Sequence, residues 1–166
     1  MSARQLREPG LVADVEAALD ATGLAPECLV VEVTESLLLD DVDATVEALG
    51  LLRELGVRVA IDDFGTGYSS LSYLGQLPVD ILKIDKSFVD GVADAGDRSL
   101  VPTILQLSRT LGLRTVAEGV ETAGQAASLA ALGCPLAQGF LFSRPLPAAD
   151  LDRLLGRGGR LDVESR

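Results

Sequence analysis

Polar side chains close or follow five short apolar runs of this chain, and their types are those that bind metals or move protons. They are Glu32, Asp62, Asp63, Asp85, Glu118, Glu121 and Gln138, and one lysine, Lys83, lies within the third run. Buried parallel strands are continuous apolar runs because helices cover both faces of their sheet. Ligands of α/β proteins bind beyond the carboxyl ends of such strands. We therefore predict one shared metal or acid–base site at the strand ends.

Several carboxylates at one site repel one another, and their pKa values rise unless a cation compensates them. Oxygen ligands favour hard divalent ions, so Mg²⁺ or Mn²⁺ is the expected cofactor. Adjacent strand residues point to opposite faces, but Asp62 and Asp63 stand where a run bends into a loop, and both can turn toward one site. Two ions ~3.5–4 Å apart would suit phosphoester hydrolysis. Alternatively, each acid caps the helix that follows it, which explains single acids better than the whole set.

The segment 62–70 is rich in glycine and serine. Gly65 and Gly67 allow backbone conformations that other residues avoid. Ser69 and Ser70 can cap a following helix or contact a phosphate at its N-terminus. The Asp-Phe-Gly tripeptide in this segment also occurs in kinases, but the chain has neither their Gly-rich phosphate loop nor their His-Arg-Asp loop. A kinase is therefore excluded.

Lysine is rare in this chain, which has two lysines against twelve arginines. Lys83 lies inside an apolar run, where a charged side chain needs a specific partner. Its compact positive charge suits the negative charge that develops on a reacting phosphate. The alternative is a structural salt bridge to Asp85 or Glu118, which does not exclude a catalytic role.

The composition narrows the classes of function. The chain has 166 residues, enough for one domain, and carries 14 basic against 25 acidic residues, a formal net charge of -11. This charge disfavours sequence-independent binding to nucleic-acid polymers, which requires clustered lysine and arginine. The chain has no histidine, which excludes Ser–His–Asp and Cys–His catalysis and zinc sites that use imidazole.

We expect a cytoplasmic protein without a membrane segment. No apolar run approaches the ~20 residues needed to cross a bilayer, and the first residues lack the pattern of a secretory signal. The two cysteines, Cys28 and Cys134, are far apart and lack the spacing of metal ligands. Each adjoins a predicted strand, so we expect both to be buried as small apolar side chains.

The apolar pattern alternates between strands and helices. We predict strands at 28–33, 57–61, 79–84, 114–117 and 135–138. We predict helices from the first turn at Pro9 to the stop signal at Gly23, and at 42–55, 71–77, 98–111, 122–132 and 148–155. Repeated strand–helix–strand units imply a parallel sheet with right-handed crossovers. The length alone favours a small open doubly wound sheet, because a complete eight-strand barrel typically needs about 250 residues.

The motifs support the barrel instead. The series Glu32-Val-Thr-Glu35, Asp62-Asp63-Phe-Gly-Thr-Gly-Tyr-Ser-Ser70, Lys83-Ile-Asp85, Ala117-Glu118-Gly-Val-Glu121 and Gln138-Gly-Phe140 resembles the EAL domain family, in order and in spacing. Those proteins are bacterial phosphodiesterases that linearise cyclic di-GMP to pGpG on a modified (βα)8 barrel. The resemblance implies a partial TIM-like α/β barrel over residues 1–155, with about five of eight parallel strands. The Gly- and Arg-rich composition of 156–166 predicts a flexible tail.

The resemblance also implies roles for individual residues. Glu32 and Asp62 resemble ligands of a first metal, and Asp62 and Asp63 ligands of a second. Lys83 resembles the lysine beside the attacking water and the scissile phosphate, and Glu118 an acid that orients or activates water. Further roles follow by position: a metal-site acid at Glu121, contacts to water or substrate at Gln138 and Asp85, and an anchor of the Asp-Phe-Gly-Thr-Gly loop at Glu35.

The chain also departs from the family pattern. The family's name-giving Glu-Ala-Leu segment, whose glutamate binds metal, is absent from its place before these motifs, and so is the asparagine ligand that normally precedes a stretch like Ser2-Ala3-Arg4-Gln5-Leu6. We therefore expect no meaningful turnover from this chain alone, and self-association through open sheet edges. Two functions remain open: an incomplete cyclic di-GMP phosphodiesterase, or an inactive module that binds cyclic di-GMP or a protein partner. A flavodoxin-like receiver is a third interpretation, but it would carry acids at fewer strand ends.

Overall fold

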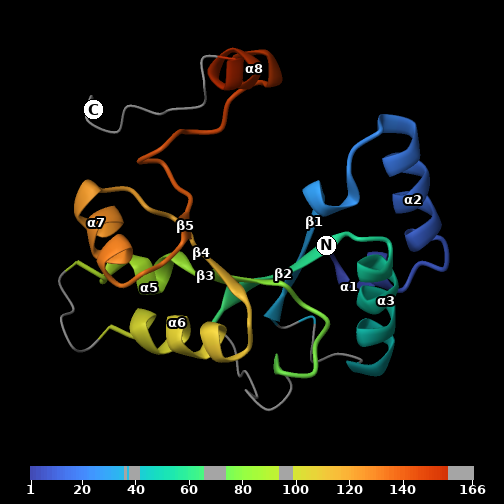
Figure 1. Ribbon diagram of the computed structural model, residues 1–166, viewed down its shortest axis with the longest axis horizontal. Coiled ribbons are helices and arrows are strands. Elements are labelled where there is room, and N and C mark those ends of the chain that lie inside the picture. The colour runs from blue at the N-terminus through green and yellow to red at the C-terminus, as the bar shows by residue number, and fades with distance from the viewer. Residues whose placement is uncertain (36, 38–41, 66–73, 94–98, 157–166) are drawn as a thin grey trace.

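One sheet of five parallel strands forms the centre of the protein in a computed structural model, which describes residues 1–35, 37, 42–65, 74–93 and 99–156 (Figure 1). The strands are β1 (Val30–Thr34), β2 (Arg58–Phe64), β3 (Ile81–Ile84), β4 (Arg114–Ala117) and β5 (Leu136–Ala137). Their order in the sheet is β1-β2-β3-β4-β5, and every neighbouring pair is parallel. All carboxyl ends of the strands therefore lie at one edge, which we call the carboxyl edge.

The strand order decides between the two predicted architectures. A doubly wound sheet reverses its strand order at a switch point, whereas each strand here pairs with the strand that precedes it in the chain. Successive strands added in one direction form the wall of a barrel. The prediction of a partial barrel wall with five parallel strands is thus confirmed for the described part of the chain, and the open doubly wound sheet is wrong.

Helices surround this wall. They are α1 (Ala3–Leu6), α2 (Leu11–Thr22), α3 (Val42–Glu54), α5 (Lys86–Asp90), α6 (Val101–Thr110), α7 (Ala123–Ala131) and α8 (Ala148–Gly156), with a 3₁₀ turn at Pro26–Cys28. In Figure 1, α2 and α3 lie beside the β1 end of the sheet, and α7 lies beside β5. Local signals set these helices: Gly23 ends α2 with φ 67°, and Thr122 with Gln125 forms a capping box on α7.

The core lies between the strands and their helices. Val33, Ile61 and Leu82, on the three consecutive strands β1 to β3, are fully buried. Leu49 and Leu52 of α3 are also fully buried, because the apolar stripe of an amphipathic helix must cover the sheet. The continuous apolar runs in the sequence therefore correspond to buried strands, as predicted.

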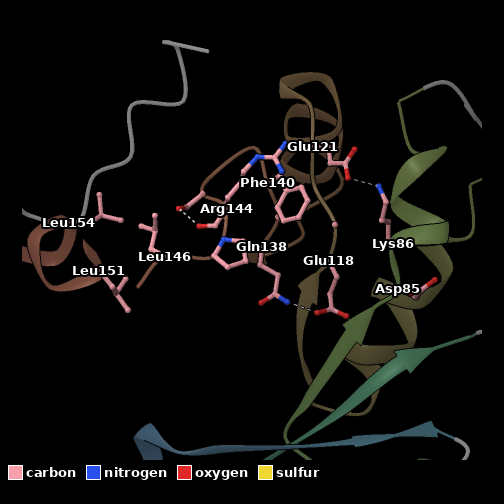
Figure 2. A pocket seen from close by; sticks show the side chains of 14 residues that line it. Asp85, Lys86, Glu118, Glu121, Gln138, Phe140, Arg144, Leu146, Leu151 and Leu154 are labelled. Atoms are coloured by element: carbon pink, nitrogen blue, oxygen red, sulfur yellow. Dashed lines mark hydrogen bonds and ion pairs between the residues drawn. The ribbon is translucent and has the colours of Figure 1, made fainter. Parts of the chain in front are cut away.

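Helix α8 is an exception, because it lies apart from the sheet (Figure 1). The main hydrophobic core contains none of its described residues. Leu151 and Leu154 of α8 instead line a cavity of about 840 Å³ that reaches to the end of β5 (Figure 2). In the part of the chain that the structure describes, no helix is both long and apolar enough to cross a membrane.

Some local predictions differ from the structure. The second strand extends to Phe64, because the buried Phe64 side chain and its pairing with Ile84 continue the sheet beyond Asp62 and Asp63. Cys28 is exposed and Cys134 is partly buried, so the expectation that both are buried is wrong. Helix α8 includes Gly156, and the rest of the predicted tail, 157–166, lies outside the described residues. Self-association through the edge strands β1 and β5 stays a prediction.

A candidate metal and lysine site at the carboxyl edge

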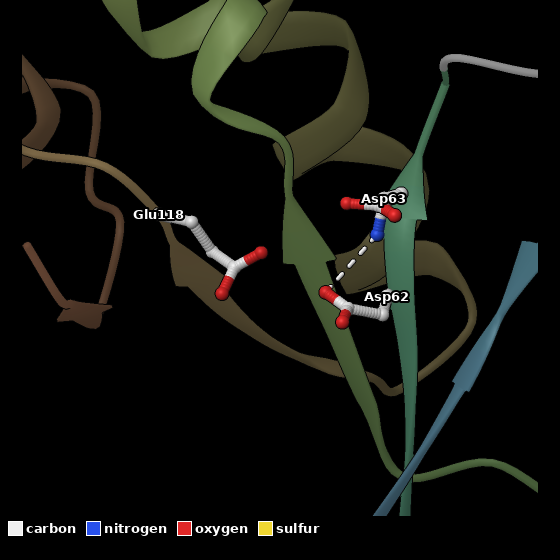
Figure 3. A group of neighbouring side chains, drawn as sticks. All are labelled: Asp62, Asp63 and Glu118. Atoms are coloured by element: carbon white, nitrogen blue, oxygen red, sulfur yellow. Dashed lines mark hydrogen bonds between the residues drawn. The ribbon is translucent and has the colours of Figure 1, made fainter. Parts of the chain in front are cut away.

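Asp62 and Asp63 lie near the end of β2, where the strand has a register irregularity between Ile61 and Phe64. Asp63 has φ 55°, whereas the other non-glycine residues in the described ranges have negative φ. Aspartate tolerates this left-handed conformation better than most residues. The backbone N–H of Asp63 donates a hydrogen bond of 3.1 Å to Oδ1 of Asp62. This kink breaks the strand alternation, so that the two carboxylates lie on the same side of β2 (Figure 3).

Glu118 completes a group of three acids, which we call the three-acid cluster. It follows β4, and its carboxylate lies across β3 from Asp62 and Asp63 (Figure 3). One oxygen from each of the three carboxylates lies within 4.8 Å of the other two. Three convergent carboxylate oxygens fit a hard divalent cation and offer no soft ligand. The residues present therefore suit the predicted type of metal.

Lys83 of β3 links the acids of three other strands. Its Nζ lies 2.9 Å from Glu32 Oε1, 3.0 Å from Asp62 Oδ1 and 2.9 Å from Glu118 Oε1. The whole residue is 5% exposed, so this charge is buried against its partners. Burial alone would lower the pKa of Lys83, but the hydrogen bonds to the three carboxylates outweigh it and raise the pKa above its ordinary value. Lys83 therefore stays protonated.

The three acids of the cluster differ in their electrostatics. Burial raises the pKa of Asp62, but the hydrogen bond from Lys83 and its charge outweigh burial and lower this pKa below its ordinary value. Burial raises the pKa of Glu118, against the opposing contribution of Lys83. Burial and the neighbouring charges of Asp62 and Asp85 raise the pKa of Asp63. Asp62 is therefore the most acidic position, and Glu118 and Asp63 hold protons more tightly than ordinary acids.

Glu35 holds the backbone that follows β2. Its Oε2 accepts a hydrogen bond of 2.8 Å from the Gly65 N–H, and the residue is 6% exposed. Gly65 has φ 95°, and a Cβ there would lie 2.8 Å from Cε2 of Phe88. Only glycine fits this position without a shift. The remainder of the predicted loop, 66–70, lies outside the described residues.

Gln138 supports Glu118 from the neighbouring strand end. Its Nε2 donates a short hydrogen bond to Glu118 Oε1 (Figure 2). Backbone bonds from Gln138 N to Ala117 O and from Val120 N to Gln138 O, of 2.8 and 3.0 Å, fix the two segments together. A Cβ on Gly139 would lie 2.2 Å from the Val120 carbonyl oxygen, so the close approach requires glycine.

The other two predicted site residues lie beside the cluster. Asp85 caps helix α5, and its Oδ1 accepts hydrogen bonds from the backbone N–H and the hydroxyl of Ser87, which lower the pKa of Asp85. Glu121 forms an ion pair with Lys86, at 3.0 Å between Oε1 and Nζ. Both acids line the 840 Å³ cavity (Figure 2). Within the described residues, neither belongs to the three-acid cluster.

A family model described as the EAL domain matches residues 1–145 of this chain. The chain belongs to the EAL domain family. It is 49% identical over 162 residues to the cyclic di-GMP phosphodiesterase NbdA of Pseudomonas aeruginosa. This match covers 97% of this chain and 21% of NbdA. It is also 49% identical over 152 residues to the bifunctional diguanylate cyclase/cyclic di-GMP phosphodiesterase MucR of the same organism, covering 91% and 22%. The chain thus spans about a fifth of these two relatives.

Solved EAL structures share the fold of this chain. A cyclic di-GMP complex of the Pseudomonas MucR phosphodiesterase has a TM-score of 0.84 at 49% identity, covering 91% of this chain and 62% of that chain. The EAL domain of DcpA from Mycobacterium smegmatis has a TM-score of 0.89 at 44% identity, covering 95% and 71%. A manganese and cyclic di-GMP complex of Klebsiella pneumoniae BlrP1 has a TM-score of 0.76 at 38% identity, covering 85% and 36%. The resemblance to the family that the motifs indicated is confirmed.

The EAL fold brings most of the predicted residues together. Glu32, Asp62, Lys83 and Glu118 are in direct contact, Asp63 joins through the three-acid cluster, and Gln138 through Glu118. Glu32 and Glu121, predicted as metal ligands, lie outside the three-acid cluster, whereas Glu118, predicted to act on water, lies within it.

Some residues that line the adjacent cavity of this EAL domain were not predicted from the sequence. Lys86 pairs with Glu121 there, and the Arg144 guanidinium lies over the Phe140 ring, 4.8 Å from its centroid. Two signals could have identified them. Lys86 is one of two lysines in the chain, and Phe140 closes the last motif.

Proposed function

We propose that this EAL domain binds cyclic di-GMP and hydrolyses one of its phosphodiester bonds with the help of divalent cations. The observation that carries the proposal is the junction of Lys83 with Glu32, Asp62 and Glu118, next to the oxygens of the three-acid cluster. A cation site and a fixed positive charge beside the phosphate both favour phosphodiester hydrolysis. We propose cyclic di-GMP as the substrate because relatives are described as cyclic di-GMP phosphodiesterases and as cyclic di-GMP complexes.

Asp62, Asp63 and Glu118 would hold the cation, and we propose Mg²⁺ or Mn²⁺ because all three ligands are carboxylates. The ion pair of Glu32 with Lys83 supports a further role for Glu32 at the border of this cation site. When bound, a divalent cation supplies Lewis acidity toward a phosphate oxygen and lowers the pKa of water.

Lys83 and Glu118 would carry the proton and charge chemistry. Lys83 remains protonated and presents a fixed charge toward a phosphate that gains negative charge as water attacks. With one carboxylate oxygen on the cation, the other oxygen of Glu118 would accept a proton from that water; burial raises the pKa of Glu118 before a cation binds. Gln138 orients the Glu118 carboxylate by donating to Oε1, and Glu35 holds the start of the loop after β2.

The proposal is tested with the chain as it stands. Calorimetry with cyclic di-GMP, with and without Mn²⁺ or Mg²⁺, measures binding, and chromatography of the products measures pGpG. We expect cyclic di-GMP binding that requires the cation and is lost in Asp62→Asn. Asp80→Asn, at the opposite edge of the sheet, is the matched control and should bind normally.

The outcomes separate the candidate functions. Release of pGpG establishes the phosphodiesterase, and it would contradict the expectation from the sequence that this chain alone shows no meaningful turnover. Cation-dependent binding of cyclic di-GMP without any pGpG would identify a nucleotide-binding module and overturn the hydrolytic part of the proposal. Absence of both binding and product would overturn it entirely.

A further inference from the structure

Lys86, the first residue of α5, reaches across the carboxyl edge to the turn that carries Glu118. Its Nζ lies 3.0 Å from Oε1 of Glu121 and 2.7 Å from Oδ1 of Asp90, which lies one helical turn further along α5. Its aliphatic chain passes directly over Gly119, where a Cβ would lie 2.5 Å from Cγ of Lys86. The lysine therefore contacts the turn twice, through its methylene groups and through its charge. Figure 2 shows the ion pair with Glu121.

The turn from Glu118 to Glu121 is held by backbone hydrogen bonds at its other positions. Glu118 N donates to Ile84 O at 3.0 Å, and Val120 N donates to Gln138 O at 3.0 Å. The N–H of Glu121 donates to Oε1 of Gln125 at 2.8 Å. Gly119 has φ 66°, in the left-handed region, and the Lys86 chain covers it. The contact with Lys86 thus adds a side-chain restraint at the most deformable residue of the turn.

We propose that Lys86 is a positioning residue of the metal site: its contacts with Gly119 and Glu121 hold the turn that places the Glu118 carboxylate beside Asp62 and Asp63. This inference rests on the proposed function, because it concerns the cation site of the same edge. Lys83 and Lys86 are the two lysines of the chain. Lys83 contacts the acids of the site, whereas Lys86 acts on one of them through the backbone.

The sign of the effect distinguishes positioning from simple electrostatics. Lys86 is a positive charge close to a group of acids, so its removal makes the local potential more negative and would strengthen cation binding. Loss of a positioning contact has the opposite effect, because supporting residues around a metal typically contribute about 10–100-fold to affinity. The half-exposed Lys86–Glu121 pair is weak by itself, so we expect the lower end of that range.

The test uses the full chain and Mn²⁺ alone as the probe. Lys86→Met keeps most of the aliphatic length and removes the charge. Electron paramagnetic resonance of free Mn²⁺ gives the dissociation constant, and we expect it to rise about tenfold. Lys86→Arg, which keeps the charge, should bind within about twofold of the unaltered chain. Asp90→Asn, which removes the other partner of Lys86, is the matched control and should leave Mn²⁺ affinity unchanged.

Amide exchange supplies a second measurement that needs neither metal nor turnover. In Lys86→Met, the backbone amides of Val120 and Glu121 should exchange faster than in the unaltered chain, while circular dichroism stays the same. Equal or tighter Mn²⁺ binding by Lys86→Met, or a failure of Lys86→Arg to restore affinity, would overturn the inference. If the unaltered chain does not bind Mn²⁺, the proposed function fails, and unchanged exchange at these amides would overturn the positioning role separately.

Discussion

Charged residues are arranged differently at the carboxyl edge of the sheet and at the opposite edge, where the strands begin, which we call the amino edge. At the amino edge, Asp80 is fully matched: Oδ1 accepts from Arg53 Nη2 at 2.8 Å, and Oδ2 accepts from the Val59 N–H at 2.9 Å. At the carboxyl edge, one lysine serves three acids, and the pKa values of Asp63 and Glu118 are raised. The paired charges at the amino edge stabilise the wall of the barrel. The acids at the carboxyl edge carry excess negative charge, which can bind a cation or act on a substrate.

Backbone conformation shows the same contrast. The amino edge continues the regular ladder, with Asp80 N donating to Val59 O and Arg114 N donating to Asp80 O. The carboxyl edge contains the left-handed Asp63 and the register irregularity of β2. Unfavourable backbone conformations that a fold maintains are concentrated at functional sites. We therefore expect a division between stability at the amino edge and chemistry at the carboxyl edge.

Replacing Lys83 should produce the largest effect. Lys83→Met leaves the carboxylates without their cation, so we expect loss of about 10³-fold or more in pGpG formation. Without metal, the free energy of unfolding should fall by about 2–3 kcal/mol, because removing one partner strands buried charge. Urea unfolding with and without Mn²⁺ measures this, and Mn²⁺ should restore part of the loss. Retention of both activity and stability would refute the division.

Two substitutions of Asp63 separate its ligand from its backbone. Both Asp63→Asn and Asp63→Ala should weaken Mn²⁺ binding by about 10–100-fold, because both remove a carboxylate from the three-acid cluster. Asparagine tolerates φ 55° and should leave the free energy of unfolding nearly unchanged, whereas alanine should lower it by about 1 kcal/mol. Calorimetry and urea unfolding measure the two effects. Equal stability of the two variants would contradict the assigned role of the kink.

The affinity of the carboxyl edge for Mn²⁺ should also depend on pH. The pKa values of Glu118 and Asp63 are raised, so Mn²⁺ must displace protons from both carboxylates. The affinity for Mn²⁺ should therefore begin to decline at a pH above the ordinary pKa values of 4.5 and 3.8, and decline further as the pH falls toward them. Glu118→Gln should flatten this decline. A Mn²⁺ affinity that is constant down to pH 4.5 would contradict the raised pKa values.

Folding without metal follows the same groups. A raised folded-state pKa means that the folded chain binds the proton more tightly than the unfolded chain, so Glu118 and Asp63 favour folding as the pH falls through their folded-state pKa values. The pKa of Asp62 is lowered, so its contribution is present above 3.8 and is lost as the pH falls through its folded-state value. Urea unfolding of the unaltered chain, Asp62→Asn and Glu118→Gln as a function of pH measures these contributions, and the differences of the two variants from the unaltered chain should have slopes of opposite sign.

The smallest effect should come from the amino edge. Asp80→Asn removes a half-exposed ion pair with Arg53 and weakens one hydrogen bond to Val59. We expect a loss of about 1 kcal/mol in the free energy of unfolding. Cyclic di-GMP and Mn²⁺ binding should not change. Impaired binding in this variant would show that the two edges are coupled.

Much of this protein was determined by its sequence alone. The predicted strands and helices within the described residues match the structure to within a few residues, because burial and turn signals act locally. The short α1 and α5 were not predicted, and the short helix predicted at 71–77 begins outside the described residues. The motifs also identified the family and the residues of the carboxyl edge. Phe64 is a boundary that local pattern missed, since its pairing with Ile84 is a contact between strands.

Only the tertiary structure decided which polar groups meet. Sequence spacing does not distinguish Glu118 from Glu121, three residues further along, but the turn directs Glu118 to Lys83 and Glu121 to Lys86. It also does not show that Asp63 takes a left-handed conformation, which brings two adjacent carboxylates to one side. Distances between strand ends depend on strand order and register, which arise from long-range packing. The sequence thus determines which chemical groups are present, and the fold determines which of them come together.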